Sequence, residues 1–232
     1  RKARLSPKKM VTFTFDDCPK TAAKYGAGIL ESNGISGTFY VALGILGSKT
    51  VCGRIMEMED ILSLKERGHE IGCHTHDHIS CADHPAALIR NNCLKNHEAA
   101  NRKGIDLKSF SYPFGEITLK SKKVISGLYQ SAGTIENGVN RNVIDLDCLK
   151  AVPWYEDVCE KKILYYLEEL ERKGGWLIFY THDISDTPSK YGCSKEKFEQ
   201  IVRACHTKKV EYKTMIEGVK YINELTDKKK QD

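Results

Sequence analysis

The sequence predicts an α/β fold, a distorted (β/α) barrel with about seven parallel strands. Short β-branched and aromatic segments alternate with longer amphipathic segments, and glycine, proline or asparagine residues separate many of them. This alternation is typical of βα units around a mainly parallel sheet. A length of 232 residues suits a small barrel better than a long open sheet. We therefore expect a single domain over residues 1–232, with its core at about residues 10–226.

Four strands are expected in the first half of the chain. They are rich in Val, Ile, Phe, Tyr and Thr, and turn-forming residues follow them. These strands are expected at residues 10–15, 37–43, 70–73 and 109–112. The helices between them are expected at residues 21–32, 57–66 and 84–103, and Gly34 and Gly68 end the first two.

The second half continues the alternation. Strands are expected at residues 132–135, 176–180 and 210–212, of which the second is the most apolar in the chain. Helices are expected at residues 119–128, 160–173, 195–208 and 216–225. The stretch from 136 to 152 has no clear period, so it predicts no element.

The composition excludes several classes of protein. Hydrophobic residues make up 41% and charged residues 29%, which argues against disorder, collagen and coiled coil. No apolar run is long enough for a transmembrane helix. The net charge is +5, and much of the excess lies in residues 1–9 and 228–230. We expect solvated tails there, and no nucleic-acid partner.

The cysteines point to a reducing environment. There are nine of them, an odd number with no CxxC pair, which argues against a disulfide framework and a zinc ribbon. No apolar signal segment follows the basic first residues. We therefore expect a cytoplasmic location, and the sequence does not predict an oligomeric state.

Three expected strands end in residues that bind metals or transfer protons. Asp16 and Asp17 follow the first strand, His74 and His78 follow the third, and His182 follows the apolar strand. Because parallel strands end at one edge of a sheet, we expect these side chains on one face. Two imidazoles and one carboxylate make three protein ligands with open positions, which is typical of a catalytic metal.

This set predicts metal-assisted hydrolysis of an amide or ester. Zinc lowers the pKa of a bound water to about 7. One aspartate of the adjacent pair can bind the metal while the other takes a proton, and a third histidine can protonate the leaving group. Each motif alone is common in turns, caps and cores. Their occurrence at three strand ends favours a catalytic site.

The same motifs resemble the polysaccharide deacetylases, also called carbohydrate esterase family 4 or the chitooligosaccharide deacetylase homology domain. Residues 14–19, Thr-Phe-Asp-Asp-Cys-Pro, are similar to the first motif of the family, T-F-D-D-G-P. Residues 74–78, His-Thr-His-Asp-His, match the second motif, H-[ST]-x-x-H. Residues 37–41 and 68–72 also resemble family segments, and the resemblance covers nearly the whole chain.

The resemblance implies a role for each motif residue. Asp16 would be the general base, and Asp17, His74 and His78 would bind a divalent metal. His182 falls in a loose match to the L-x-H motif and would be the general acid. The implied reaction removes an N-acetyl group, or less often an O-acetyl group, from a sugar or glycan. We expect Zn²⁺ as the cofactor, and the same ligands serve Co²⁺, Ni²⁺ or Mn²⁺.

The third motif departs from the family pattern R-x-P-[YF]-G. Ser111 stands where the family has an arginine that pairs with the base, and Arg141 is a candidate replacement. The backbone N–H of Phe114 can still donate to an oxyanion. We expect Tyr112 and Pro113 to line the substrate pocket with it.

Other departures predict a divergent branch with a substrate smaller than a polymer. The fourth motif has no clean match, so we expect Trp154 as an aromatic wall, and Asp145 and Asp147 are candidates only for the partner of His182. Tyr191, in a loop long enough to form a lid over residues 181–193, is a candidate for stacking on a sugar ring. Cys18 replaces a glycine and is expected to place a thiol beside the metal, where it narrows the pocket or sensitises it to oxidation.

Two alternatives stay open at the level of sequence. The same site could hydrolyse a non-sugar amide, such as a formamide or a cyclic imide. The chain could also be a catalytically inactive carbohydrate-binding homologue, and the missing arginine favours this interpretation. The complete set of aspartates and histidines argues against it.

Overall fold

The structure is a computed structural model that describes residues 1–5 and 8–228. Seven parallel strands follow one another in the order β10-β11-β2-β3-β6-β7-β8 and form a curled sheet. Their bounds are Val152–Pro153, Gly175–Thr181, Lys9–Phe15, Thr38–Val41, Glu70–Cys73, Ser109–Ser111 and Ser131–Gly133, in the same order. The short strand β12, Glu211–Tyr212, pairs with the first half of β2. The predicted α/β fold with about seven parallel strands is therefore confirmed.

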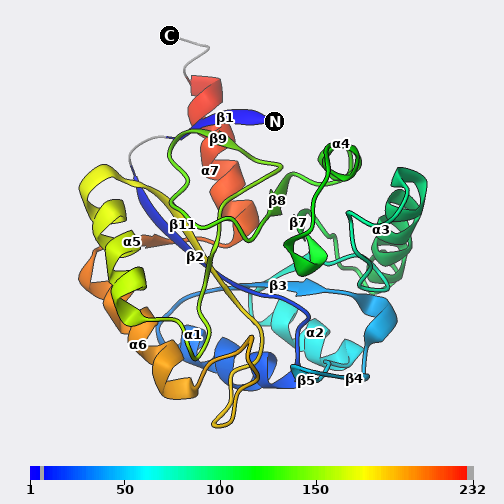
Figure 1. The fold of residues 1–232 in the computed structure, drawn as a ribbon, viewed down its shortest axis with the longest axis horizontal. Helices are drawn as coiled ribbons and strands as arrows, with labels where there is room; N and C mark the ends of the chain where they lie inside the picture. Colours follow the sequence, from blue (N-terminus) through cyan, green and yellow to red (C-terminus); the bar gives the residue numbers. More distant parts are fainter. Residues whose placement is uncertain (6–7, 229–232) are drawn as a thin grey trace.

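Helices surround this sheet (Figure 1). They are α1 Ala27–Ser32, α2 Met58–Glu66, α3 Ala86–Asn101, α4 Leu119–Ser126, α5 Glu160–Lys173, α6 Lys195–Thr207 and α7 Met215–Lys228. The π-helix Ala22–Gly26 precedes α1, and the 3-10 turns Leu43–Ile45 and Pro113–Gly115 follow β3 and β7. Among the described residues, no helix combines the length and the apolar character needed to cross a membrane.

The segment that the sequence left without an element joins the two edges of the sheet. On one side, Ala132 of β8 donates to the carbonyl of Leu146 at 2.7 Å and accepts from the N–H of Leu149 at 2.8 Å. On the other side, the N–H of Trp154 donates to the carbonyl of Tyr180 in β11 at 2.9 Å. One stretch of chain thus contacts both edge strands, and it closes the curled sheet toward a barrel.

Side chains of β2 alternate between two apolar clusters, as a buried strand requires. Phe13 and Phe15 pack outward in the cluster beneath the helices, and Phe15 stacks on Phe39 with ring centroids 4.6 Å apart. Met10 packs in a second cluster with Trp176 of β11. Trp176 donates from Nε1 to Thr12 Oγ1 at 2.8 Å, so its one polar group is satisfied.

Helix α7 lies against this second cluster. Its first turn is held by Glu70, which accepts hydrogen bonds from the N–H of Ile216 at 2.9 Å and from Thr38 Oγ1 at 3.0 Å. Gly218 lies so close to Trp176 that an added Cβ would be 2.5 Å from a ring carbon of the indole. This glycine therefore lets α7 approach the strands.

The expectation of a solvated N-terminal tail is wrong for the residues described there. Lys2–Leu5 form β1, which pairs antiparallel with β9, Asn142–Asp145. Arg1 forms ion pairs with Asp145 and Asp147, and Lys8 pairs with Glu211 at 2.8 Å. These acidic partners lie far along the chain, so a local charge count does not show them. Of the C-terminal lysines, Lys229 and Lys230 lie outside the described residues.

Replacing Gly218 with alanine tests the close packing of α7. We expect Gly218→Ala to lower the free energy of unfolding by about 1–3 kcal/mol, because the new methyl group forces the helix away from Trp176. Urea denaturation measures the change. Gly28→Ala is the matched helical control, because nothing lies within 4 Å of its added Cβ, and it should stabilise the protein by up to about 1 kcal/mol. Equal effects of the two substitutions would contradict this account of α7.

Candidate active site

The motif residues gather around one cavity of about 490 Å³ at the C-terminal ends of the strands. Asp16 and Asp17 follow β2, His74 follows β6, and His182 follows β11. His78 reaches the same cavity from the loop after β6. Other lining residues are Ile45, Thr50, Val51, Tyr112, Phe114, Gly115, Ile135, Tyr155, Tyr180 and Tyr191.

Asp17, His74 and His78 present ligand atoms to one point. Asp17 Oδ1 lies 2.8 Å from His78 Nε2 and 3.4 Å from His74 Nε2. Within the described part of the chain, this buried oxygen has no well-directed hydrogen bond. One carboxylate oxygen that faces two imidazole nitrogens without hydrogen-bond geometry fits a shared cation better than a hydrogen-bond network.

The electrostatics of these residues favour a positive charge at that point. Burial raises the pKa of the Asp17 carboxyl, yet its contacts with His74 and His78 outweigh burial and hold that pKa well below its usual range. Burial lowers the pKa of His74, but its contact with Asp17 and the charge of Asp16 raise it to about 9. The carboxylate pair therefore attracts a cation strongly.

Hydrogen bonds and the backbone geometry of the loop orient His74 and His78. His74 Nδ1 donates to the carbonyl of Ser111 at 2.8 Å, which leaves Nε2 for Asp17. The second motif is a tight loop and not a helical turn, because Thr75 and His78 have φ values of 60° and 53°. Thr75 Oγ1 accepts from the N–H of Ile79 at 3.0 Å and stabilises this loop.

Asp16 lies beside this point in a different environment. It is 7% exposed, its Oδ2 accepts from Ser111 Oγ at 3.1 Å, and its backbone N–H donates to the carbonyl of Thr181 at 3.0 Å. Its Oδ1 has no hydrogen-bond partner among the described residues. The carboxylate is thus held by one oxygen while the other stays available, as a proton acceptor requires.

His182 is oriented by the loop that follows it. Its Nδ1 donates to the carbonyl of Tyr191 at 3.2 Å, so Nε2 is the nitrogen left for the cavity. Asp183, next to it, accepts from the N–H and the hydroxyl of Ser189 at 2.8 and 2.5 Å. These bonds shape the loop that brings Tyr191 to the cavity.

The sequence matches a known family over more than half of its length. Residues 3–130 match the family described as Polysaccharide deacetylase. The chain belongs to the polysaccharide deacetylase family. No curated protein matches the chain by sequence.

Solved structures of deacetylases share this fold. The Xyl-CE4 domain of a multidomain xylanase from the hindgut metagenome of Trinervitermes trinervoides is 17% identical, covers 92% of this chain and 91% of its own, and has a TM-score of 0.63. A family 4 acetyl xylan esterase from Clostridium thermocellum, solved with a cobalt ion, is 19% identical and has a TM-score of 0.63. The match covers 92% of this chain and 91% of the esterase chain. The chitin deacetylase of the fungal pathogen Colletotrichum lindemuthianum is 18% identical and has a TM-score of 0.62. The match covers 93% of this chain and 89% of the deacetylase chain.

The candidate charge partners of Asp16 and His182 lie elsewhere in this polysaccharide deacetylase. Arg141 pairs with Glu169 of α5 at 3.1 Å, so it does not replace the third-motif arginine beside Asp16. Asp145 and Asp147 pair with Arg1, so neither orients His182. Both expectations were wrong, because these long-range ion pairs leave no local pattern in the sequence.

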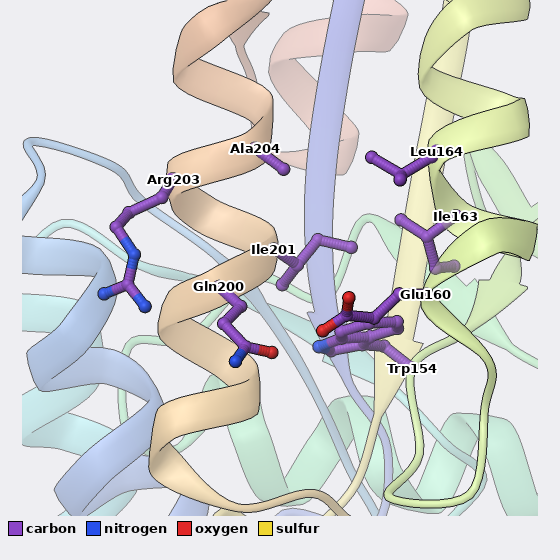
Figure 2. Close-up of a pocket in the computed structure, with 8 residues that line it drawn as sticks. All are labelled: Trp154, Glu160, Ile163, Leu164, Gln200, Ile201, Arg203 and Ala204. Carbon is purple, nitrogen blue, oxygen red and sulfur yellow. The ribbon is translucent and has the colours of Figure 1, made fainter.

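Trp154 is not part of the cavity wall. It is buried, and its Nε1 donates to the carbonyl of Lys197 at 3.1 Å. Figure 2 shows it beneath α5 and α6, where it lines a separate pocket with Ile163 and Ile201. The next residue, Tyr155, lines the active-site cavity in its place. Side chains alternate along extended chain, so a shift of one residue exchanges the two faces.

Of the remaining residues expected in the pocket, some line the cavity and one does not. Tyr112, Phe114 and Tyr191 line the cavity, whereas Pro113 is buried and is not among its lining residues. The ring of Phe114 is 60% exposed and meets His78 edge-on, with centroids 4.6 Å apart.

The thiol of Cys18 points away from the cavity. Cys18 is buried, and its Sγ donates to the carbonyl of Tyr40 at 3.1 Å. Burial, followed by the charges of Asp16 and Asp17, raises the pKa of this thiol well above its usual value. The expectation that it narrows the pocket or sensitises it to oxidation was therefore wrong. Its φ of 56° explains why the family motif has a glycine here.

Replacing His78 tests the three-residue ligand set. We expect His78→Ala to weaken Zn²⁺ binding more than about 100-fold, since one of three ligands is lost. His76→Ala is the control, because His76 lies between the two ligands in sequence but pairs with Asp77 at 2.6 Å. Equilibrium dialysis measures both affinities. A similar loss in the two variants would argue against this ligand set.

Proposed function

We propose that this polysaccharide deacetylase is a metal-dependent hydrolase that removes an N-acetyl group, or less often an O-acetyl group, from a sugar or glycan. The observation that carries the proposal is the arrangement around one cavity. Asp17, His74 and His78 converge on a point there, and Asp16 and His182 line the same cavity. This arrangement supplies a cation site, a proton acceptor and a proton donor within reach of one substrate group.

Asp17 Oδ1, His74 Nε2 and His78 Nε2 are suited to hold the cation. Imidazole and carboxylate ligands suit Zn²⁺, and also Co²⁺, Ni²⁺ or Mn²⁺. The cobalt ion in the Clostridium thermocellum esterase supports a metal here. When bound, a divalent cation lowers the pKa of water and polarises the acyl carbonyl.

Asp16 acts as the general base. Its Oδ1 accepts the proton of the attacking water, while the Ser111 hydroxyl holds Oδ2 and fixes the plane of the carboxylate. A hydroxyl performs the orienting part of the role that an arginine would have. Unlike an arginine, it supplies no positive charge.

Two further groups complete the reaction. The backbone N–H of Phe114, in the 3-10 turn after β7, is the proposed donor to the oxyanion that forms as the carbonyl is attacked. His182 gives a proton from Nε2 to the amine as it leaves, and Tyr191 keeps its ring in place through Nδ1. Protonation of the amine makes it a good leaving group, which an amide substrate requires.

The shape of the cavity supports a sugar-sized ligand. Its volume of about 490 Å³ is within the usual range for small-molecule sites. Tyr155, Tyr180 and Tyr191 give it an aromatic wall, and phenolic rings present both an apolar face and a hydroxyl to a sugar. A chitin deacetylase and an acetyl xylan esterase share the fold, so both amide and ester substrates belong in the test.

Release of acetate from N-acetylated sugars tests the function directly. We expect Zn²⁺-dependent release by the unmodified protein, and a loss of at least about 100-fold in kcat in Asp16→Asn, because the amide cannot take a proton. Zinc affinity, measured in parallel, should stay near normal in Asp16→Asn. Acetylated xylan fragments provide the ester arm of the same assay.

Two outcomes would count against the proposal. Near-normal turnover by Asp16→Asn would show that another group is the base. No release from protein shown to hold zinc would favour hydrolysis of a non-sugar amide or a carbohydrate-binding role.

The aromatic wall gives a second kinetic test. We expect Tyr155→Ala to raise KM by about 2- to 10-fold with a smaller effect on kcat, because the lost ring packs on the substrate and not on the reacting atoms. Tyr165→Ala, on the outer face of α5, is the control with unchanged KM. An unchanged KM in Tyr155→Ala would place the substrate elsewhere in the cavity.

A further inference from the structure

Asp17 belongs to two groups of metal-ligating side chains. One is the set with His74 and His78, and the other contains Cys52 and His182. In the second group, one ligand atom from each residue lies within 4.8 Å of the other two. The two groups share Asp17 and are otherwise distinct, so the cavity offers a second place for a cation.

A short hairpin carries Cys52 to this place. The hairpin consists of β4, Lys49–Thr50, and β5, Gly53–Arg54, and Thr50 Oγ1 accepts from the N–H of Cys52 at 3.2 Å. At the tip, Val51 is 73% exposed whereas Cys52 is 3% exposed. The hairpin therefore turns one side chain outward and directs the thiol inward.

The hairpin is fixed to the motif that carries Asp17. The N–H of Met56, just after β5, donates to the carbonyl of Cys18 at 3.0 Å. Pro19 and Ile55 form an isolated antiparallel bridge beside it. These backbone contacts hold Cys52 in register with the end of β2.

The buried thiol has acidic groups near it, among them its neighbour Asp17. Burial, and then the charge of Asp17, raise the pKa of Cys52 to about 12, and Asp183 and Asp16 contribute in the same direction. A thiol packed only as a small hydrophobic group would not need carboxylates around it. A divalent cation at this place would offset their charge.

We propose that Asp17, Cys52 and His182 form a second position that binds a thiophilic divalent cation, such as Zn²⁺ or Cd²⁺, and that its occupation inhibits the enzyme. Sulfur, nitrogen and oxygen ligands in one set favour such ions over Mg²⁺ or Ca²⁺. Asp17 would supply a ligand atom to either position. Coordination of the sulfur releases the Cys52 proton to solvent.

Inhibition follows from the identity of one ligand. His182 Nε2 is the nitrogen proposed to protonate the leaving amine, and an imidazole nitrogen bound to a metal carries no proton. This inhibitory effect rests on the proposed function. The second cation position rests only on the placement of Asp17, Cys52 and His182.

Cadmium binding tests the position without reference to activity. The full chain is used with Cys148 and Cys159 replaced by serine, because these two cysteines are the accessible ones that would bind cadmium adventitiously. We expect calorimetry to give two Cd²⁺ per chain, with a near-ultraviolet thiolate-to-cadmium absorption band on the second. In the same background, Cys52→Ser should bind one Cd²⁺ and lose the band.

His182→Gln provides the independent variant, since it removes the second position without touching the thiol. It too should bind one Cd²⁺ with unchanged affinity at the first position. Two bound ions and an unchanged band in Cys52→Ser or in His182→Gln would overturn the second position. The second position would also be overturned if the background protein, with Cys52 and His182 intact, bound only one Cd²⁺ and showed no thiolate-to-cadmium band.

Acetate release at increasing Zn²⁺ then tests inhibition. We expect excess Zn²⁺ to inhibit the unmodified protein. In Cys52→Ser, the Zn²⁺ concentration that inhibits should rise at least about tenfold. The rate of each protein is compared with its own rate at one equivalent of zinc. Equal inhibition of the two proteins would overturn the inhibitory role. Absence of acetate release, together with the expected cadmium stoichiometry, would overturn the proposed function and leave the second position standing.

Discussion

The architecture depends on two carboxylates at the end of an inner strand, one buried and the other partly buried. Asp16 and Asp17 follow β2, which pairs with β11 on one side and β3 on the other, and a buried charge is costly unless partners surround it. The partners come from other strands: His74 and His78 after β6, and Ser111 at the end of β7. The ends of these strands must therefore meet at one place, and the curl of the sheet provides for this.

Elements with a strong local period could be predicted closely. The strand Glu70–Cys73 and the helix Glu160–Lys173 have the expected bounds, because burial of one face leaves a repeating pattern in the sequence. The segment around Leu146 and Leu149 could not be predicted, since its hydrogen bonds go to Ala132, Thr134 and Arg1 and not to its own neighbours in sequence. A strand of two residues, such as Val152–Pro153, is too short to display any period.

At the active site too, residues beside strongly periodic elements could be placed from the sequence, whereas residues held by distant contacts could not. Residues next to strong strands, such as Asp17 and His182, could be placed on one face because a strand end fixes their position. Trp154 and Tyr155 follow a weak strand. If the predicted register is off by one residue there, the side chain assigned to the cavity is the one that packs in the core. Cys52 has no sequence signal at all, because hydrogen bonds between the hairpin and the loop after β2 determine where its thiol lies.

Ser111 also sets the charge balance of the cavity. In the proposed mechanism, a divalent cation would lie among the side chains of Asp16 and Asp17, and a guanidinium in place of the Ser111 hydroxyl would add one positive charge to the cavity. Acyl hydrolysis produces a carboxylate anion, and an excess positive charge would hold that anion in the site. Under the proposed function, the neutral hydroxyl beside Asp16 would leave an acetate product with less electrostatic attraction to overcome as it departs. The departure from the family motif would then favour rapid release of an anionic product.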